Sequence, residues 1–207
     1  MSFVVYSLPR SRSAWLSHYL TYKDHTCLHE PAMTMRHPDD YYSLLKVKNV
    51  GIADTGIAQG WRLIEYACPG IKTVVVHRPV EEAVDSLMKL DLAGIATYEK
   101  TSLTKHFEYG KRMLDEISRR SDVLSVNFSD LNHEEVCKKI FQHCLPYEFD
   151  YEHWKYCSEL NIQIDVKGML LYYFKNKPEI TNFKRLCKLE MIKLRRQYPE
   201  LDVWKEV

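Results

Sequence analysis

The sequence lacks a strong net charge, a paired-cysteine motif and a long hydrophobic run. Its 207 residues include 29 lysines and arginines against 28 aspartates and glutamates, a balance that favours neither nucleic acid nor an anionic membrane as a partner. Any anion-binding site must therefore be local. The six cysteines form no Cys-x-x-Cys pair, which argues against a zinc site or a disulfide framework.

The chain also lacks an apolar run long enough to span a membrane and a charged-then-apolar leader. We therefore expect a cytoplasmic protein in a reducing compartment, with no membrane span, no metal and no nucleic-acid partner. Internal repeats, low-complexity tracts and linkers are absent as well. This predicts a single domain over residues 1–207, with a helical C-terminal part from about residue 155; the oligomeric state stays unknown.

The sequence does contain an alternation of β-rich runs and segments with helical spacing. The runs at 3–5 and 74–76 are continuously apolar, as expected of strands that helices cover on both faces. The pattern predicts an α/β fold with a central parallel sheet of about five strands flanked by helices. The predicted strands are residues 3–8, 26–29, 50–53, 71–77 and 123–128.

Local signals predict where several helices begin and end. Pro38-Asp39-Asp40 and Pro79-Val80-Glu81-Glu82 each place proline and acidic residues at a helix start. Asn132, followed three residues later by Glu135, has the spacing of a capping box. A basic helix is expected from Asn182 to Gln197.

The turn after the first predicted strand, residues 9–14, is rich in arginine and serine. Backbone N–H groups at a helix start lack intrahelical partners, and Ser11 and Ser13 add hydroxyl donors while Arg10 and Arg12 add charge. This predicts a site for a phosphate-like anion. The alternative is a solvated loop whose serines cap the helix.

The turn departs from the ATP-binding pattern GxxxxGK[ST] in an informative way. Alignment places Arg12 at the second glycine, Ser13 at the lysine and Ala14 at the hydroxyl that binds magnesium. Alanine cannot ligate a metal. The turn therefore suggests a donor whose group transfer does not need a metal bridge between phosphates.

Three segments, in the right order, resemble the sulfotransferase family. Residues 9–15, PRSRSAW, are similar to the family's loop P-[KR]-S-G-[ST]-[ST]-W, which binds the 5′-phosphosulfate of 3′-phosphoadenylyl sulfate (PAPS). Residues 68–87 resemble its strand and helix in which an arginine, and a serine eight residues later, hold the donor's 3′-phosphate. Residues 123–131, followed by a helix and Leu145-Pro146, are similar to its Tyr-Glu-Asp-Leu segment.

The resemblance implies a three-layer P-loop NTPase-like fold and a sulfotransferase that uses PAPS without a metal. It would transfer a sulfuryl group to a hydroxyl or amine of a small-molecule or carbohydrate acceptor. Arg10, which stands where family members carry a lysine, is expected to stabilise the leaving group by charge. The resemblance assigns donor binding to Arg10, Ser11, Arg12, Ser13, Ala14, Trp15, Arg78 and Ser86. An ion pair with Glu81 or Glu82 is the alternative role for Arg78.

Fainter similarities, His29-Glu30-Pro31 and Asp54-Thr55, follow the second and third predicted strands. Some members of the family use a glutamate in the first of these regions, so Glu30 is our candidate general base, with His29 or Asp54 as alternatives.

Two departures from the family pattern leave other functions open. Arg12 replaces a glycine and is expected to need an ordinary backbone conformation or a changed loop. The Arg-Lys-Gly segment that closes over the donor is not found after residue 155; Lys184, Arg185 and Lys188 would substitute for it or form a solvated face. The alternatives are a nucleotide or small-molecule kinase with Asp54 holding magnesium, and a non-catalytic nucleotide-binding protein.

Overall fold

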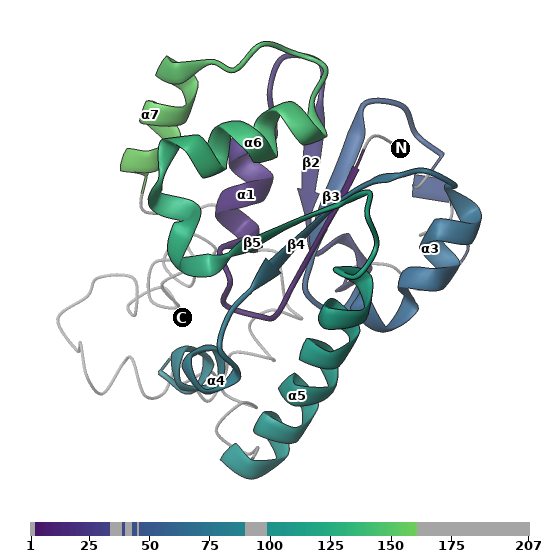
Figure 1. The fold of residues 1–207 in the computed structure, drawn as a ribbon, viewed down its shortest axis with the longest axis vertical. Helices are drawn as coiled ribbons and strands as arrows, with labels where there is room; N and C mark the ends of the chain where they lie inside the picture. The colour runs from purple at the N-terminus through teal and green to yellow at the C-terminus, as the bar shows by residue number, and fades with distance from the viewer. Residues whose placement is uncertain (1–2, 34–38, 40–42, 45, 90–98, 161–207) are drawn as a thin grey trace, which may run out of the picture.

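A five-stranded, all-parallel β-sheet forms the centre of the molecule (Figure 1). The computed structural model describes residues 3–33, 39, 43–44, 46–89 and 99–160. The strand order is β2-β3-β1-β4-β5, which confirms the predicted α/β class, and each predicted strand is present. The strands are β1 (Phe3–Ser7), β2 (Thr26–His29), β3 (Val50–Asp54), β4 (Lys72–His77) and β5 (Val123–Asn127).

Helices cover both faces of the sheet, so the molecule has three layers (Figure 1). Helices α1, α6 and α7 lie on one side, and α3, α4 and α5 lie on the other. The helices are α1 (Ser13–Tyr19), α3 (Trp61–Ala67), α4 (Val80–Met88), α5 (Lys100–Ile117), α6 (Glu134–Cys144) and α7 (Tyr151–Glu159). In the described part of the chain, 3-10 turns connect several of these elements: η1 (Pro31–Met33), η2 (Ile57–Gly60) and η3 (Phe128–Asn132). None of the described helices combines the length and apolar character needed to cross a bilayer.

Strand β1 shows why the strands read as continuous apolar runs. Its five residues are all buried. Phe3 and Val5 pack in the core under α1 and α6, whereas Val4 and Tyr6 pack in the core under α4 and α5. Because successive side chains point to opposite faces, a strand that is covered on both sides needs apolar residues throughout.

The helices that follow β1 and β4 lie on opposite faces of the sheet, and this leaves a crevice at the carboxyl ends of the two strands. These strands are neighbours, yet α1 follows β1 onto one face and α4 follows β4 onto the other. In parallel α/β sheets, ligands bind beyond the carboxyl ends of the strands where the connections diverge in this way. The turn after β1 and the residues after β4 therefore border one crevice.

One predicted helix start is wrong. Helix α6 begins at Glu134, its N-cap residue is His133, and no side chain caps it. Asn132 ends η3 instead, and its Oδ1 accepts a hydrogen bond of 2.6 Å from Arg12 Nη1. A charged donor forms a stronger hydrogen bond than a neutral backbone N–H group, which explains why the distant arginine prevails over the local pattern. The helices predicted to begin at Pro38 and to run from Asn182 to Gln197 lie outside the described residues.

Candidate functional site

The residues after β1 and β4 that the sequence singled out are in direct contact. Arg78, which follows β4, donates a hydrogen bond from Nη1 to the backbone carbonyl of Arg10. Arg10 in turn donates from Nε to Ser86 Oγ on α4, at 3.4 Å. The two predicted anion-binding segments, 68 residues apart in the sequence at their arginines, are therefore parts of one cluster.

The turn after β1 has an unusual backbone. Arg10 and Arg12 both lie in the left-handed region, with φ of 67° and 61°. Of the two expectations for Arg12, an ordinary backbone conformation or a changed loop, the first is therefore wrong. The left-handed region costs a non-glycine residue roughly 1–2 kcal/mol, and the side-chain hydrogen bonds of Arg12 to Asn132 and to the Leu131 carbonyl (3.4 Å) offset part of this cost.

Buried polar atoms without partners are concentrated at this cluster. In the described part of the chain, three buried side-chain atoms lack a hydrogen-bond partner: Ser7 Oγ, Ser11 Oγ and Arg78 Nε. Ser7 ends β1, Ser11 lies between the two left-handed arginines and is fully buried, and Arg78 follows β4. An unpartnered buried polar group costs about 1–3 kcal/mol. All three would be explained by a ligand that presents several hydrogen-bond acceptors.

Positive charge is only partly neutralised here. Arg78 forms an ion pair with Glu82 (Nε to Oε2, 3.7 Å), so the alternative predicted for Arg78 is present beside its contact with the loop. Within the described residues neither Arg10 nor Arg12 has a carboxylate partner. Phe128, the first residue of η3, receives two guanidinium groups: Cζ of Arg78 lies 4.0 Å and Cζ of Arg12 lies 6.0 Å from its ring centroid. The surplus charge makes the crevice attractive to an anion.

The remaining predicted residues of the turn and of the start of α1 differ in burial and in their contact with the site. Ser13 is buried, and its Oγ lies 3.1 Å from His29 Nε2. Ala14 is half-buried in the first turn of α1. Trp15 belongs to the core: its ring stacks on Tyr19, and its Nε1 donates to a backbone carbonyl of α7 at 2.8 Å. Its contact with the Arg12 guanidinium, which lies 5.8 Å from the ring centroid, connects Trp15 with the site.

The candidate general base lies at the same edge of the sheet. Glu30 follows β2, and its Oε1 accepts a hydrogen bond of 2.7 Å from Thr55 Oγ1 in the turn after β3. His29 Nε2 lies 3.7 Å from the same oxygen and contacts Ser13. The structure thus connects Glu30 with the arginine-rich turn through two side chains.

Asp54, the last residue of β3, has a structural role. It is buried, and its two oxygens accept hydrogen bonds from the backbone N–H groups of Gly56 (2.9 Å) and Ala32 (3.2 Å). Burial raises the pKa of Asp54, and these hydrogen bonds oppose that shift. Both oxygens are engaged, and no group of three potential metal ligands occurs among the described residues. Asp54 therefore holds the turn after β2 and the turn after β3 together.

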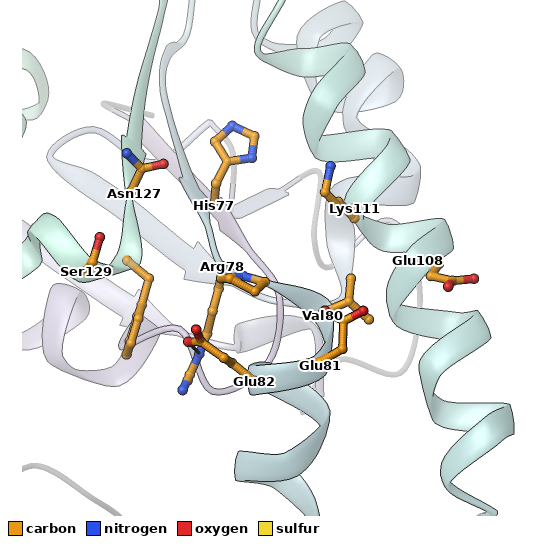
Figure 2. Close-up of a pocket in the computed structure, with 11 residues that line it drawn as sticks. His77, Arg78, Val80, Glu81, Glu82, Glu108, Lys111, Asn127 and Ser129 are labelled. Atoms are coloured by element: carbon orange, nitrogen blue, oxygen red, sulfur yellow. Dashed lines mark ion pairs between the residues drawn. The ribbon is translucent and has the colours of Figure 1, made fainter.

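A pocket of about 740 Å³ adjoins the cluster (Figure 2). It lies beyond the ends of β4 and β5, between α4 and α5, and Arg78 and Phe128 form part of its wall. Its volume is in the usual range for small-molecule sites. It brings together carboxylates (Glu81, Glu82, Glu108), cations (Arg78, Lys111) and the polar side chains of His77, Asn127 and Ser129.

Sequence reasoning gave no site role to Phe128, Asn132 or Thr55, although it named Asn132 in a capping box and Thr55 in a segment similar to the family. All three follow strands, in η3 after β5 or in the turn after β3, so the rule that ligands bind at the carboxyl edge would have pointed to them. Their particular partners depend on strand order, which the sequence pattern does not define.

Comparison with known proteins shows a likeness of structure without a detectable likeness of sequence. No family model matches the chain, and no curated protein matches it. Mouse sulfotransferase SULT7A1, solved in complex with PAP, is similar with a TM-score of 0.58 and 11% sequence identity. The likeness covers 76% of this chain but only 62% of the mouse enzyme, less than two thirds of its length. It shows a sulfotransferase-like fold.

The strain at Arg12 leads to a stability prediction. Arg12→Gly and Arg12→Ala remove the same hydrogen bonds, but only glycine adopts a φ of 61° without strain. We expect the alanine variant to be less stable than the glycine variant by about 1 kcal/mol in free energy of unfolding. Urea titrations of the two variants would measure the difference, and equal stabilities would contradict the strain assigned to this residue.

Proposed function

We propose that this chain binds PAPS and transfers its sulfuryl group to a hydroxyl or amine of a small-molecule or carbohydrate acceptor. The observation that carries the proposal is the pair of buried hydroxyls without a hydrogen-bond partner, Ser7 Oγ and Ser11 Oγ, next to two arginines. Arg78 Nε has an ion pair with Glu82 but no hydrogen bond, and Arg10 has no carboxylate partner among the described residues. Oxygens of a phosphosulfate or phosphate would accept hydrogen bonds from such donors. The fold-level likeness to a PAP-bound sulfotransferase supports a nucleotide of this kind.

Each end of the donor is assigned to one part of the cluster. Arg10, Ser11, Arg12 and Ser13, with Ala14 and Trp15 behind them, would hold the 5′-phosphosulfate end. Arg78 and Ser86 would hold the 3′-phosphate. The contact of Arg10 with Ser86 supports this division, because it brings the two ends to one cluster, as a single nucleotide requires. No metal is invoked, since Ala14 offers no ligand where a magnesium-binding hydroxyl would stand.

The donor supplies a sulfuryl group already bonded to a good leaving group. As the acceptor's oxygen or nitrogen bonds to sulfur, the bond from sulfur to the bridging oxygen breaks, and the electron pair leaves with the phosphate. The chain's own contribution is positioning and charge. Glu30 takes the proton that the acceptor loses, and the permanent charge of Arg10 stabilises the leaving oxygen by electrostatics alone.

Cytoplasmic localisation is part of the proposal. Cys27, Cys137, Cys144 and Cys157 are free thiols, which suits a reducing compartment.

Thermal unfolding with added nucleotide tests the proposal. Adenosine 3′,5′-bisphosphate (PAP), at a hundred times its Kd and without magnesium, is expected to stabilise the chain by about 2.7 kcal/mol and so to raise Tm by several degrees. ATP with magnesium should give a smaller shift. A larger shift with ATP and magnesium would favour a kinase, whereas PAP binding without turnover on panels of alcohols and amines would favour a non-catalytic protein.

A further inference from the structure

The turn after β3 contains a hydroxyl group that binds the candidate general base. Thr55 Oγ1 donates a hydrogen bond of 2.7 Å to Glu30 Oε1. The two residues follow neighbouring parallel strands, and β2 and β3 end in register, with His29 opposite Ala53. The two loops therefore meet at the carboxyl edge of the sheet, where the arginine-rich turn also lies.

The backbone on both sides of this hydrogen bond is firmly held. Asp54 accepts from Gly56 N in the turn that contains Thr55 and from Ala32 N in the turn that follows Glu30. Glu30 N also donates to the Ala53 carbonyl at 2.9 Å. One buried carboxylate thus fixes both loops, so the separation of Thr55 from Glu30 is set by the frame and not by two free side chains.

Glu30 has a strained backbone, with φ of 45°. Within the described part of the chain, five non-glycine residues have positive φ: Arg10, Arg12, Lys23, Glu30 and Asn49. Three of them, Arg10, Arg12 and Glu30, belong to the candidate site. Residues held in such conformations cost about 1–3 kcal/mol each and cluster at functional sites, where the surroundings impose the conformation.

The two oxygens of the Glu30 carboxylate are not equivalent. Oε1 accepts from Thr55 and lies 3.7 Å from His29 Nε2. Oε2 has no hydrogen-bond partner among the described residues. The Glu30 side chain is 23% exposed, so a substrate can reach it.

We infer that Thr55 is a positioning residue for the proposed sulfuryl transfer. By holding Oε1, its hydroxyl fixes the rotation of the Glu30 carboxylate and leaves Oε2 as the oxygen that takes the acceptor's proton. The inference rests on the proposed function and adds a residue to it. Thr55 itself exchanges no proton with the substrate.

Thr55→Val tests the inference, because valine keeps the shape of threonine and removes the donor. We expect kcat to fall about tenfold to a hundredfold, as for other losses of orientation at a catalytic group, with KM for PAPS and the Kd of PAP changed less than about twofold. Thr55→Ser, which retains the hydroxyl, should restore most of kcat. Thr104→Val is the matched control, since Thr104 also donates a hydrogen bond (to the Lys100 carbonyl, 2.9 Å) but lies on α5.

The outcomes separate this inference from the proposed function. A wild-type chain that neither binds PAP nor transfers sulfate would overturn both. A wild-type chain that does both, with a Thr55→Val variant of equal kcat, would overturn the positioning role alone. If the valine variant does not fold by thermal unfolding, Thr55→Ala and Thr55→Ser take its place, and equal kcat for alanine and serine at position 55 would likewise overturn it.

Discussion

Replacing Arg78 by alanine is expected to weaken the binding of PAP by at least about a hundredfold. The substitution removes a charged donor, and hydrogen bonds to charged groups are worth about 1.5–3 kcal/mol each. It also removes the hydrogen bond that fixes the Arg10 carbonyl, so the turn after β1 loses its support. Together these losses amount to about 3 kcal/mol or more, which corresponds to the stated fall in affinity. Isothermal titration calorimetry without magnesium would measure it.

The matched control for this experiment is Arg112→Ala. Arg112 lies on the exposed side of α5, where its guanidinium covers Tyr109 at 5.6 Å from the ring centroid. The control makes the same change in net charge away from the site, and we expect it to leave PAP affinity within about twofold, as is usual for a distant, screened surface charge. Unchanged affinity in a folded Arg78→Ala variant would remove the basis for the donor site.

Glu30→Gln is expected to lower kcat by about 10²- to 10⁴-fold, the usual contribution of a general base. Glutamine keeps the length of the side chain and an oxygen that can accept from Thr55 Oγ1, but it cannot take a proton. The Kd of PAP should therefore stay close to the wild-type value. Single-turnover measurements at saturating PAPS would report the transfer step itself.

The matched control for Glu30→Gln is Glu152→Gln, on the exposed surface of α7, which should leave kcat unchanged. Two further variants identify the base if Glu30 is not responsible. His29→Asn and Asp54→Asn test the alternatives. A Glu30→Gln variant with normal turnover, alongside a His29→Asn variant without it, would move the role of base to the neighbouring imidazole.

The fold was predictable because its signals are local. The runs at 3–5 and 74–76 are apolar throughout since helices cover both faces of the sheet, and this property is visible in the sequence itself. Trp15, Leu16, Tyr19 and Leu20, which follow β1 at helical spacing, are all buried. Where the strands end, and hence where the turn with Arg10 lies, followed from the same pattern.

The contacts within the site were not predictable, because they join distant parts of the chain. Arg12 meets Asn132 across 120 residues, and this contact replaced the capping box that the local spacing indicated. The left-handed conformation of Arg12 occurs together with that long-range contact, whereas residue type alone left an ordinary backbone and a changed loop both open. Thr55 and Glu30, 25 residues apart, become neighbours only because β2 pairs with β3.

The hydrogen bond from the Arg78 guanidinium to the Arg10 carbonyl also affects when the chain loses conformational freedom. A guanidinium has five N–H donors, so holding the carbonyl leaves others for a ligand. The turn reaches its final shape as the protein folds, and the entropy of ordering it is lost at that stage and not on association. A nucleotide with two anionic ends would then meet a preorganised site, and more of its interaction energy would appear as affinity.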